Sequence, residues 1–187
     1  MKLVYSIPDK LYYIQNFLDY TSYKKLHYDV FRSKLVKLKS TEKTWQKELK
    51  HGHKNFVKNT VLDIKYKPLQ KIKILLENNP FHKVKIKKFE PLIQSMSDQS
   101  GINWHDDHKY DYGITYYINR RWNIKFGGEF LFKDKHANGF IPLVANSLVI
   151  VKAPFEHKVS PVQKPIVPRK TIQIFIDEKK ENDRKNS

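Results

Sequence analysis

Apolar side chains near the N-terminus recur with the spacing of an amphipathic helix. The apolar and aromatic residues with this spacing include Leu11, Tyr12, Ile14, Phe17 and Leu18. Residues three and four apart share one face of a helix, and Asp9 is a residue type that caps helix N-termini. The pattern therefore predicts a first helix over residues 9–19. Residues 24–60 are mostly basic and polar, and the only feature predicted there is a turn at residues 50–54.

A second set of apolar residues extends from Leu62 to Leu76, again with helical spacing. It ends at Asn78-Asn79-Pro80, a sequence that cannot continue a helix. The spacing predicts a second helix over residues 62–76. Because Pro68 lies inside this range, we expect an interruption close to it.

After residue 80 the helical spacing gives way to short runs rich in β-forming residues. These runs cover residues 91–96, 112–118, 128–133, 147–152 and 171–176. Glycine, asparagine and proline separate them, a rhythm typical of an antiparallel barrel or jelly roll. Since the helices precede the strands, we expect an α+β fold in which N-terminal helices pack on one face of a sheet.

Length and composition predict one compact domain. The 187 residues are 40% hydrophobic, enough for a single core. We expect a domain over residues 1–177, made of a helical N-terminal support region (1–80) and a β core (81–177). Residues 178–187 have too little apolar content to fold and are predicted to form a disordered charged tail.

The chain has no cysteine, which excludes disulfides, thiolate metal sites and cysteine nucleophiles. Any metal must therefore be held by imidazole and carboxylate groups. The N-terminus lacks the apolar core of a secretory signal, and no apolar run approaches the ~18 residues of a membrane span. We accordingly expect a cytoplasmic protein without a membrane partner, and the sequence does not predict its oligomeric state.

Positive charge is concentrated in the first half of the chain. The formal net charge is +17, and residues 1–90 carry 21 basic against 8 acidic side chains, a difference of +13. Such a bias can attract nucleic acid, an acidic protein or a membrane surface. The lysines form no helical stripe or recognition motif, so a well-solvated surface explains them equally well.

A candidate metal site begins at His105 and Asp107. In a strand, residues two apart project to the same face, so both side chains could reach one ion. Two imidazoles and one carboxylate form the facial triad of non-haem Fe(II) oxygenases, which requires a second, distant histidine. His157 fits because it starts a β-rich run. His108 is the nearest competitor, but three residues from His105 it would lie on the opposite strand face.

From residue 104 to 176 the chain resembles the 2-oxoglutarate- and Fe(II)-dependent oxygenases, specifically the prolyl 4-hydroxylase-like group. The matching pieces, in the expected order, are His105-x-Asp107, Tyr116-Tyr117-Ile118-Asn119 with Trp122, Gly127-Gly128-Glu129-Phe130, His157-Lys158-Val159-Ser160-Pro161-Val162, and Arg169-x-Thr171. The broader similarity covers residues 84–177, and residues 1–80 match no family.

The resemblance implies a double-stranded β-helix in which His105, Asp107 and His157 bind Fe(II) and carry the catalytic centre. It further implies 2-oxoglutarate as cosubstrate, O2 as oxidant and ascorbate as an optional reductant. Arg169 would hold the far carboxylate of 2-oxoglutarate, because its planar fork makes two charge-assisted hydrogen bonds. Tyr117 matches a family tyrosine that donates to the same carboxylate, and Thr171 could add a hydroxyl.

One family position has no match in this chain. Many relatives place a tyrosine shortly before the first metal-binding histidine, where it touches the cosubstrate. No tyrosine occurs between Tyr66 and Tyr110. Asn103, Gln94 and Ser97 are the alternatives for this contact, and the sequence does not choose among them.

The resemblance implies a dioxygenase that hydroxylates a C–H bond, with a prolyl residue of a protein or peptide as the leading substrate and succinate and CO2 as products. The same iron chemistry on a nucleic acid or a free amino acid is the main alternative, and the basic N-terminal half motivates the nucleic acid. Two other hypotheses are a non-catalytic basic binding module and a zinc or cupin-like metal enzyme. The zinc or cupin-like enzyme would not need Arg169.

Overall fold

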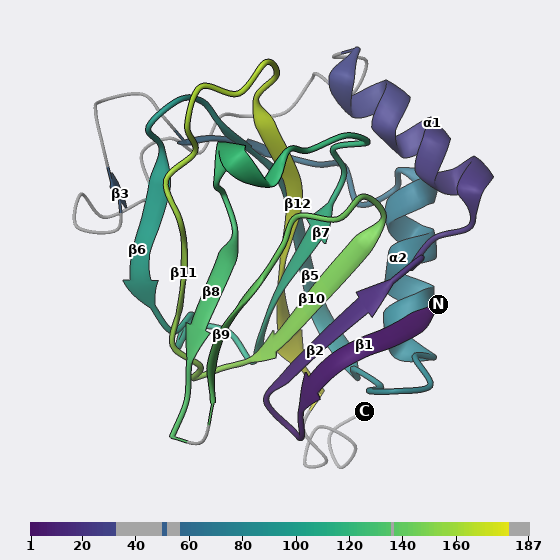
Figure 1. Cartoon of the computed structure of the whole chain (residues 1–187). Helices are drawn as coiled ribbons and strands as arrows, with labels where there is room; N and C mark the ends of the chain where they lie inside the picture. The colour runs from purple at the N-terminus through teal and green to yellow at the C-terminus, as the bar shows by residue number, and fades with distance from the viewer. Residues whose placement is uncertain (33–49, 52–56, 136, 180–187) are drawn as a thin grey trace.

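The computed structural model of the protein describes residues 1–32, 50–51, 57–135 and 137–179. Within them the chain forms two antiparallel sheets that face each other (Figure 1). The larger sheet contains, in spatial order, β1 (Lys2–Ile7), β2 (Leu11–Gln15), β10 (Ser147–Lys152), β7 (Tyr112–Tyr117), β12 (Arg169–Glu178), β5 (Ile86–Met96) and β4 (Val57–Val61). The smaller sheet contains β3 (Lys50–His51), β6 (Gly101–His105), β11 (His157–Val159), β8 (Phe130–Lys133) and β9 (Asn138–Ile141).

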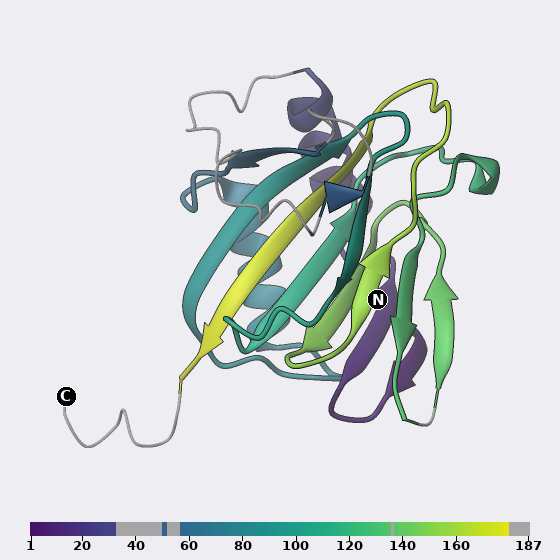
Figure 2. The same cartoon turned by 90° about the vertical axis from the view of Figure 1, so that its left-hand side faces the viewer.

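Two helices cover the outer face of the larger sheet, α1 (Tyr20–Phe31) and α2 (Lys67–Glu77), as Figures 1 and 2 show. A short 3-10 helix, η3 (Ile124–Phe126), precedes β8. The Asp19 side chain caps α1 by accepting a hydrogen bond from the Ser22 amide at 3.0 Å. The arrangement agrees with the predicted jelly-roll core carrying helices on one sheet.

The central strands are buried on both faces, because the larger sheet lies between two apolar cores. Every residue of β7 is buried. Tyr116 packs into the core beneath the helices, whereas its neighbour Tyr117 packs into the core between the two sheets. Adjacent residues of a strand point to opposite faces. One strand therefore contributes to the helical support and to the interior of the barrel at the same time.

The helix predicted over residues 9–19 is wrong. Residues 11–15 form β2, which pairs with β1 on one side and β10 on the other, and the helix begins only at Tyr20. A strand buried on both faces is apolar at nearly every position, so its sequence imitates the spacing of a helix. The helix α1 instead lies partly in the basic stretch from residue 24 onward, where no element was predicted.

The second predicted helix exists but begins later, at Lys67, and Pro68 lies in its first turn instead of interrupting it. Proline is tolerated there because the first amide groups of a helix have no intrahelical acceptor. The N-terminal region is also not purely helical, since β1, β2 and β4 join the larger sheet. Residues 50–51 of the predicted turn form β3, and residues 52–54 lie outside the described residues.

All five predicted β-rich runs contain strands of the two sheets. The strand that exceeds its predicted run by most is β5, which begins at Ile86 instead of residue 91. Most of the tail predicted at residues 178–187 lies outside the described part of the chain.

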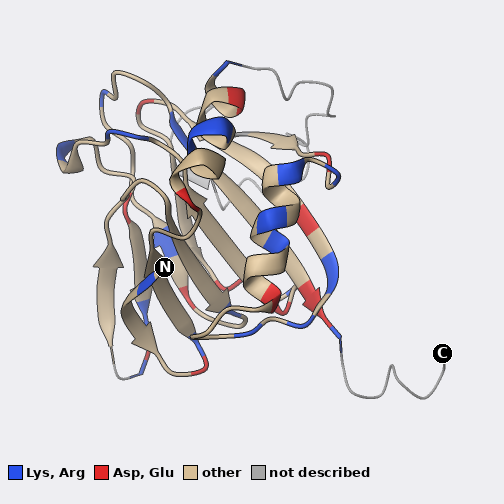
Figure 3. Ribbon diagram, turned by 90° about the vertical axis from the view of Figure 1, so that its right-hand side faces the viewer, with Lys and Arg blue, Asp and Glu red and all other residues tan. Residues whose placement is uncertain are grey.

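No described helix is both long and apolar enough to cross a membrane. Basic side chains lie on both helices and on several loops, interspersed with acidic ones (Figure 3). The positive charge of the described residues is therefore spread over the surface and is not confined to one strand or helix.

Candidate active site

The structure brings His105, Asp107 and His157 together between the two sheets. His105 is the last residue of β6 and His157 the first of β11, and the two are direct cross-strand partners. Asp107 Oδ1 lies 3.7 Å from His105 Nε2, and Asp107 Oδ2 lies 3.5 Å from His157 Nε2. One donor atom from each residue falls within 4.8 Å of the others, and this cluster is a candidate metal site.

The reason given above for pairing His105 with Asp107 is wrong. Asp107 does not lie on a strand, because β6 ends at His105 and Asp107 has a left-handed φ of 54°. The turn, not strand alternation, carries the carboxylate back toward the two rings. Gly113 on β7 makes room for it, since a Cβ there would lie 2.5 Å from Asp107 Oδ2.

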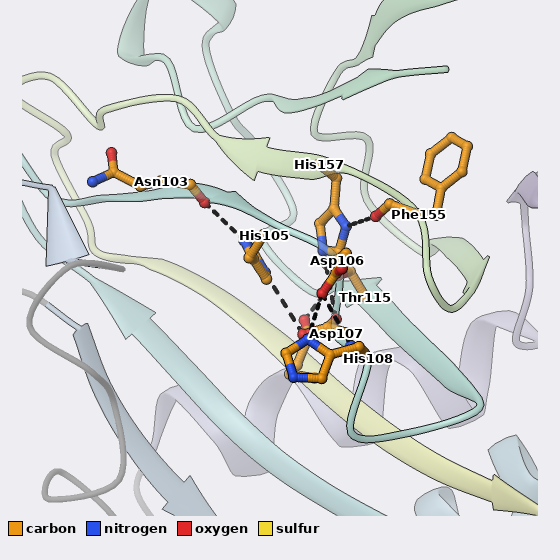
Figure 4. A network of polar contacts seen from close by, with 9 residues as sticks. Asn103, His105, Asp106, Asp107, His108, Thr115, Phe155 and His157 are labelled. Carbon is orange, nitrogen blue, oxygen red and sulfur yellow. Dashed lines mark hydrogen bonds and ion pairs between the residues drawn. The ribbon is translucent and has the colours of Figure 1, made fainter. Parts of the chain in front are cut away.

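Backbone carbonyl groups fix the orientation of both imidazoles. His105 Nδ1 lies 2.7 Å from the Asn103 carbonyl oxygen, and His157 Nδ1 lies 2.7 Å from the Phe155 carbonyl oxygen. A carbonyl oxygen can only accept, so each neutral ring carries its proton on Nδ1 and turns an unprotonated Nε2 toward Asp107. Figure 4 shows the two carbonyl groups on the far sides of the rings. This is the usual support for metal-binding histidines.

His108 is not part of the cluster. Its side chain is 70% exposed, and its Nδ1 lies 2.7 Å from Asp106 Oδ1 (Figure 4). Asp106 is likewise not one of the clustered residues. The two residues form a separate polar pair on the rim of the site.

The charges of the cluster suit metal binding near neutral pH. Burial acts to raise the pKa of Asp107, but the nearby His157 and His105 rings outweigh burial and leave that pKa below its ordinary value. Burial, with a smaller contribution from His157, lowers the pKa of His105. Ionised carboxylate and neutral imidazole are the forms that coordinate a metal.

Arg169, the first residue of β12, is fully buried. Its Nε donates to the Gly128 carbonyl oxygen at 2.9 Å, and its Nη1 points at Met96 Sδ at 3.6 Å. Burial lowers its pKa, while Tyr117 and Glu129 act in the opposite direction. Arginine stays charged even so. Tyr117 lies close to the guanidinium, but among the described residues no carboxylate forms an ion pair with Arg169.

Tyr117 and Thr171 face the same interior space as Arg169. They are cross-strand partners on β7 and β12, and Thr171 follows Arg169 by two residues on one strand face. The Arg169 Cζ lies 5.6 Å from the centre of the Tyr117 ring. Burial raises the pKa of Tyr117, so its hydroxyl keeps its proton and can donate. The structure thus gathers the three residues that the resemblance assigned to 2-oxoglutarate.

Four polar atoms in this space are buried without a hydrogen-bond partner, namely Asp107 Oδ2, Tyr117 Oη, Arg169 Nη2 and Thr171 Oγ1. Buried polar groups in folded proteins nearly always have partners. A cation at the triad would satisfy the Asp107 oxygen, and a carboxylate would satisfy the guanidinium and the two hydroxyls. The residues present therefore fit an Fe(II) ion with a bound dicarboxylate such as 2-oxoglutarate.

Sequence reasoning missed the roles of Gly128 and Gly113. Gly127-Gly128 was named only as part of a matching motif, yet the Gly128 carbonyl oxygen accepts a hydrogen bond from Arg169 Nε, and a Cβ at Gly128 would lie 2.8 Å from Arg169 Cδ. The place of the glycine pair in the ordered set of motif pieces was the signal that could have indicated this role. For Gly113 no signal exists, because its neighbour Asp107 arrives through a turn.

Among the alternatives for the missing tyrosine, Gln94 lies on the inner sheet face. It is buried and pairs directly with Thr171 across β5 and β12. Ser97 is exposed, and Asn103 contributes its backbone carbonyl to His105. A contact between Gln94 and the cosubstrate stays a prediction.

Comparison with known proteins gives one family match and many similar folds. Residues 91–177 match the family described as the 2OG-Fe(II) oxygenase superfamily. No curated protein matches the chain by sequence. A prolyl-4-hydroxylase from Pseudomonas putida is similar in structure, with a TM-score of 0.68 and 14% identity over 91% of this chain and 94% of that one.

Two further similar structures are also prolyl hydroxylases. One, from Trichoplax adhaerens and in complex with a peptide fragment of the hypoxia inducible factor oxygen degradation domain, has a TM-score of 0.70 and 15% identity over 96% of this chain and 89% of that one. The other, a viral collagen prolyl hydroxylase from Paramecium Bursaria Chlorella virus-1 in a 2OG complex, has a TM-score of 0.61 and 12% identity over 90% and 96%. At these identities the likeness establishes the fold.

Proposed function

Because residues 91–177 match the family described as the 2OG-Fe(II) oxygenase superfamily, we propose that the protein is a dioxygenase that hydroxylates prolyl residues of proteins or peptides. The observation that carries the oxygenase assignment is the cluster of His105, Asp107 and His157, together with the buried, unpaired polar atoms of Asp107, Arg169, Tyr117 and Thr171. These atoms match the charges of an Fe(II) ion and a dicarboxylate, and a purely structural barrel would gain nothing by burying them.

In this proposal His105, Asp107 and His157 hold Fe(II), and Arg169, Tyr117 and Thr171 hold the far carboxylate of 2-oxoglutarate. When bound, the iron and cosubstrate supply oxidative chemistry, in which 2-oxoglutarate and O2 become succinate and CO2 while a substrate C–H becomes C–OH.

The protein's own contribution is orientation and exclusion of water. The Asn103 and Phe155 carbonyls keep the histidine protons on Nδ1, which leaves each Nε2 available to the metal. Phe130 stacks on the His157 ring with centroids 4.9 Å apart and shields it from solvent. Arg169 keeps the carboxylate site charged in an apolar interior, so a dicarboxylate binds in one direction only.

The prolyl substrate is supported by resemblance rather than by a residue that reads proline. The motif order in the sequence resembles the prolyl 4-hydroxylase-like group, and prolyl hydroxylases have the same fold. One of those similar structures holds a peptide. A peptide substrate also needs no strong charge complement, which agrees with the mixed charge of the surface in Figure 3.

The first experiment is an anaerobic titration of the protein with Fe(II) and then 2-oxoglutarate, monitored by the visible charge-transfer band of the chelate. We expect a band in the wild type, no band in Asp107→Ala, and a band that needs far more 2-oxoglutarate in Arg169→Ala. His108→Ala is the matched control, because His108 lies next to the triad but outside it. Tight Zn(II) binding without any band would contradict the oxygenase assignment.

The second experiment tests the substrate. The protein is incubated with Fe(II), 2-oxoglutarate, ascorbate and a panel of capped proline-containing peptides, and mass spectrometry detects the gain of one oxygen atom. Product from at least one peptide, absent in Asp107→Ala, is the expected result. A band in the first experiment with no product from any peptide would overturn the prolyl substrate and leave the oxygenase.

A nucleic-acid substrate is the second candidate, favoured by the +13 charge of residues 1–90. It predicts binding to a single-stranded oligonucleotide that weakens steeply as salt rises, because bound phosphates release counterions. Oxidation of the oligonucleotide together with inactivity on the peptide panel would favour this candidate over the prolyl one.

A further inference from the structure

The side chain of Asn59, on β4, is buried without any partner for its amide. Asn59 is 1% exposed, and both its Nδ2 and its Oδ1 lack a hydrogen bond. An amide offers two donors and an acceptor oxygen, and burying all of them unpaired destabilises a folded protein. Among the described residues only Asn59 has an amide with both polar atoms in this state.

The strand register sets Asn59 on the inner face of the larger sheet. Asn59 pairs with Gln94, Gln94 with Thr171, and Thr171 with Tyr117. Directly opposed residues of paired strands point to the same face. Asn59 therefore belongs to the row of polar side chains that crosses the sheet floor of the candidate active site.

Asn59 is too far from the Arg169 pocket to bind the same group. Neighbouring strands are about 4.8 Å apart, so Asn59 and Thr171, two strands apart, are separated by roughly 10 Å. A single carboxylate held by Thr171 and Tyr117 cannot also reach the Asn59 amide. The dicarboxylate therefore does not supply a partner for the unpaired atoms of Asn59.

Strand β4 lies at the margin of the described part of the larger sheet. Within the described residues, β4 is the last strand of the larger sheet, and β5 is its hydrogen-bonded neighbour there. A long substrate can cross the site at a sheet margin without displacing a central strand. The reacting centre lies further in, at the triad.

We propose that Asn59 is a positioning residue that binds a peptide group of the primary substrate. Its Nδ2 donates to a substrate carbonyl and its Oδ1 accepts from a substrate N–H, which are the complementary halves of one amide. A neutral amide suits this role because it recognises main chain without demanding a charge. The inference rests on the proposed function, since it requires a protein or peptide substrate.

Two other buried polar side chains of the described residues, Asn79 and Asp134, have different surroundings. Asn79 Oδ1 accepts from the Phe81 and His82 amides, so only its Nδ2 is unpaired. Asp134 Oδ1 pairs with the Lys10 ammonium. These residues cap a turn or anchor a surface lysine, and neither faces the row that holds Thr171.

The test uses Asn59→Leu, which has nearly the same size but no polar atoms. A positioning role predicts three results together. The melting temperature of the ligand-free protein rises, because an unpaired buried amide is gone. The 2-oxoglutarate titration of the charge-transfer band is unchanged. The KM for the best peptide of the panel rises about 10-fold, with a smaller change in kcat.

Two further variants keep the test decisive. Asn59→Ala removes the amide without adding a bulky side chain, and it should raise the peptide KM to a similar extent. Thr60→Val is the matched control, because Thr60 is the next residue of β4 and pairs with Ile93, whose side chain packs under the helices. Thr60→Val should leave the peptide KM unchanged.

A lower melting temperature in Asn59→Leu would overturn the inference, because the amide would then be a structural group. Weakened 2-oxoglutarate binding would overturn it as well and make Asn59 a cosubstrate contact. An unchanged peptide KM in both Asn59 variants, with an active wild type, rejects the positioning role alone. A wild type that shows the band but oxidises no peptide rejects the proposed substrate class, and the inference with it.

Discussion

The Gly128 carbonyl oxygen accepts a hydrogen bond from Arg169 Nε at 2.9 Å, and the same glycine leaves free the space that Arg169 Cδ occupies. A Cβ at Gly128 would lie 2.8 Å from that carbon. Gly128 also has a φ of 79°, a backbone conformation that other residues rarely adopt. The position of the buried arginine therefore depends on a residue 41 positions earlier.

Gly128→Ala should weaken 2-oxoglutarate binding by at least about 10-fold and destabilise the fold by roughly 1–3 kcal/mol, because strain and the clash with Arg169 act together. The band titration and urea unfolding measure the two effects. Gly139→Ala is the control, since its Cβ would meet only the tip of the Phe132 ring. Wild-type affinity in Gly128→Ala would show that Arg169 does not need this glycine.

Gly113→Ala should abolish Fe(II) binding, because the new Cβ would lie 2.5 Å from Asp107 Oδ2 and would push this oxygen out of its position. Anaerobic calorimetry with Fe(II) measures the loss. Ile114→Val is the control, because Ile114 packs into the helix-side core and should cost about 1 kcal/mol of stability with no change in metal affinity. If Gly113→Ala binds Fe(II) like the wild type, Asp107 is not held by this strand.

Tyr117→Phe and Thr171→Val should each raise the stability of the ligand-free protein and weaken 2-oxoglutarate binding about 5-fold. Each variant removes a buried hydroxyl that has no partner until a carboxylate arrives. Thermal unfolding and the band titration report the two opposite changes. A loss of stability in either variant would contradict the assignment of these hydroxyls to a ligand.

Tyr116→Phe provides the comparison for the preceding pair of variants. The Tyr116 hydroxyl donates to Asn146 Oδ1 at 2.8 Å on the helix side of the sheet. Its removal should lower stability by about 1 kcal/mol and leave 2-oxoglutarate binding intact. Tyr116→Phe should thus lower the stability of the ligand-free protein, whereas Tyr117→Phe should raise it.

Acidification should destabilise the protein partly through His82. Its Nε2 lies 3.2 Å from the Tyr112 hydroxyl. Burial, together with Lys152, lowers the pKa of His82 below its ordinary value of 6.5, although two acidic residues act in the opposite direction. The unfolded chain then takes up the proton first as pH falls. The stability contributed by neutral His82 is present above pH 6.5 and is lost as the pH falls through the folded-state pKa.

His82→Gln should lose less unfolding free energy than the wild type between about pH 7.5 and about pH 5, because glutamine does not titrate. Urea unfolding at the two pH values measures the difference. An equal loss in both proteins would mean that His82 has the same pKa in the folded and unfolded states.

The sequence predicted the β core and the site residues better than it predicted the N-terminal elements. The motif residues His105, Asp107 and His157 lie together in the structure, and the role of Arg169 in binding 2-oxoglutarate stays a prediction. The N-terminal region offered only apolar spacing. Strand β2 is buried on both faces, so its spacing could not be distinguished from that of a helix.

Contacts that arise from main-chain geometry had no signal in the sequence. The left-handed turn at Asp107 and the carbonyl acceptors at Asn103 and Phe155 depend on where the backbone runs after folding. The same holds for Asn59, whose significance appears only once β4, β5 and β12 are aligned. An isolated asparagine in a basic, polar stretch predicts none of this.

Backbone carbonyl groups, not side chains, orient the two histidine rings, and this makes the candidate metal site tolerant of sequence change. The groups that orient the His105 and His157 rings are carbonyl oxygens two residues earlier in the chain, and every amino acid supplies one. The orientation and tautomer of the two rings therefore do not depend on the side chains at positions 103 and 155, although Phe155 itself packs in the core between the two sheets. The sequence of the substrate-binding surface can therefore change while the metal-binding residues keep their orientation.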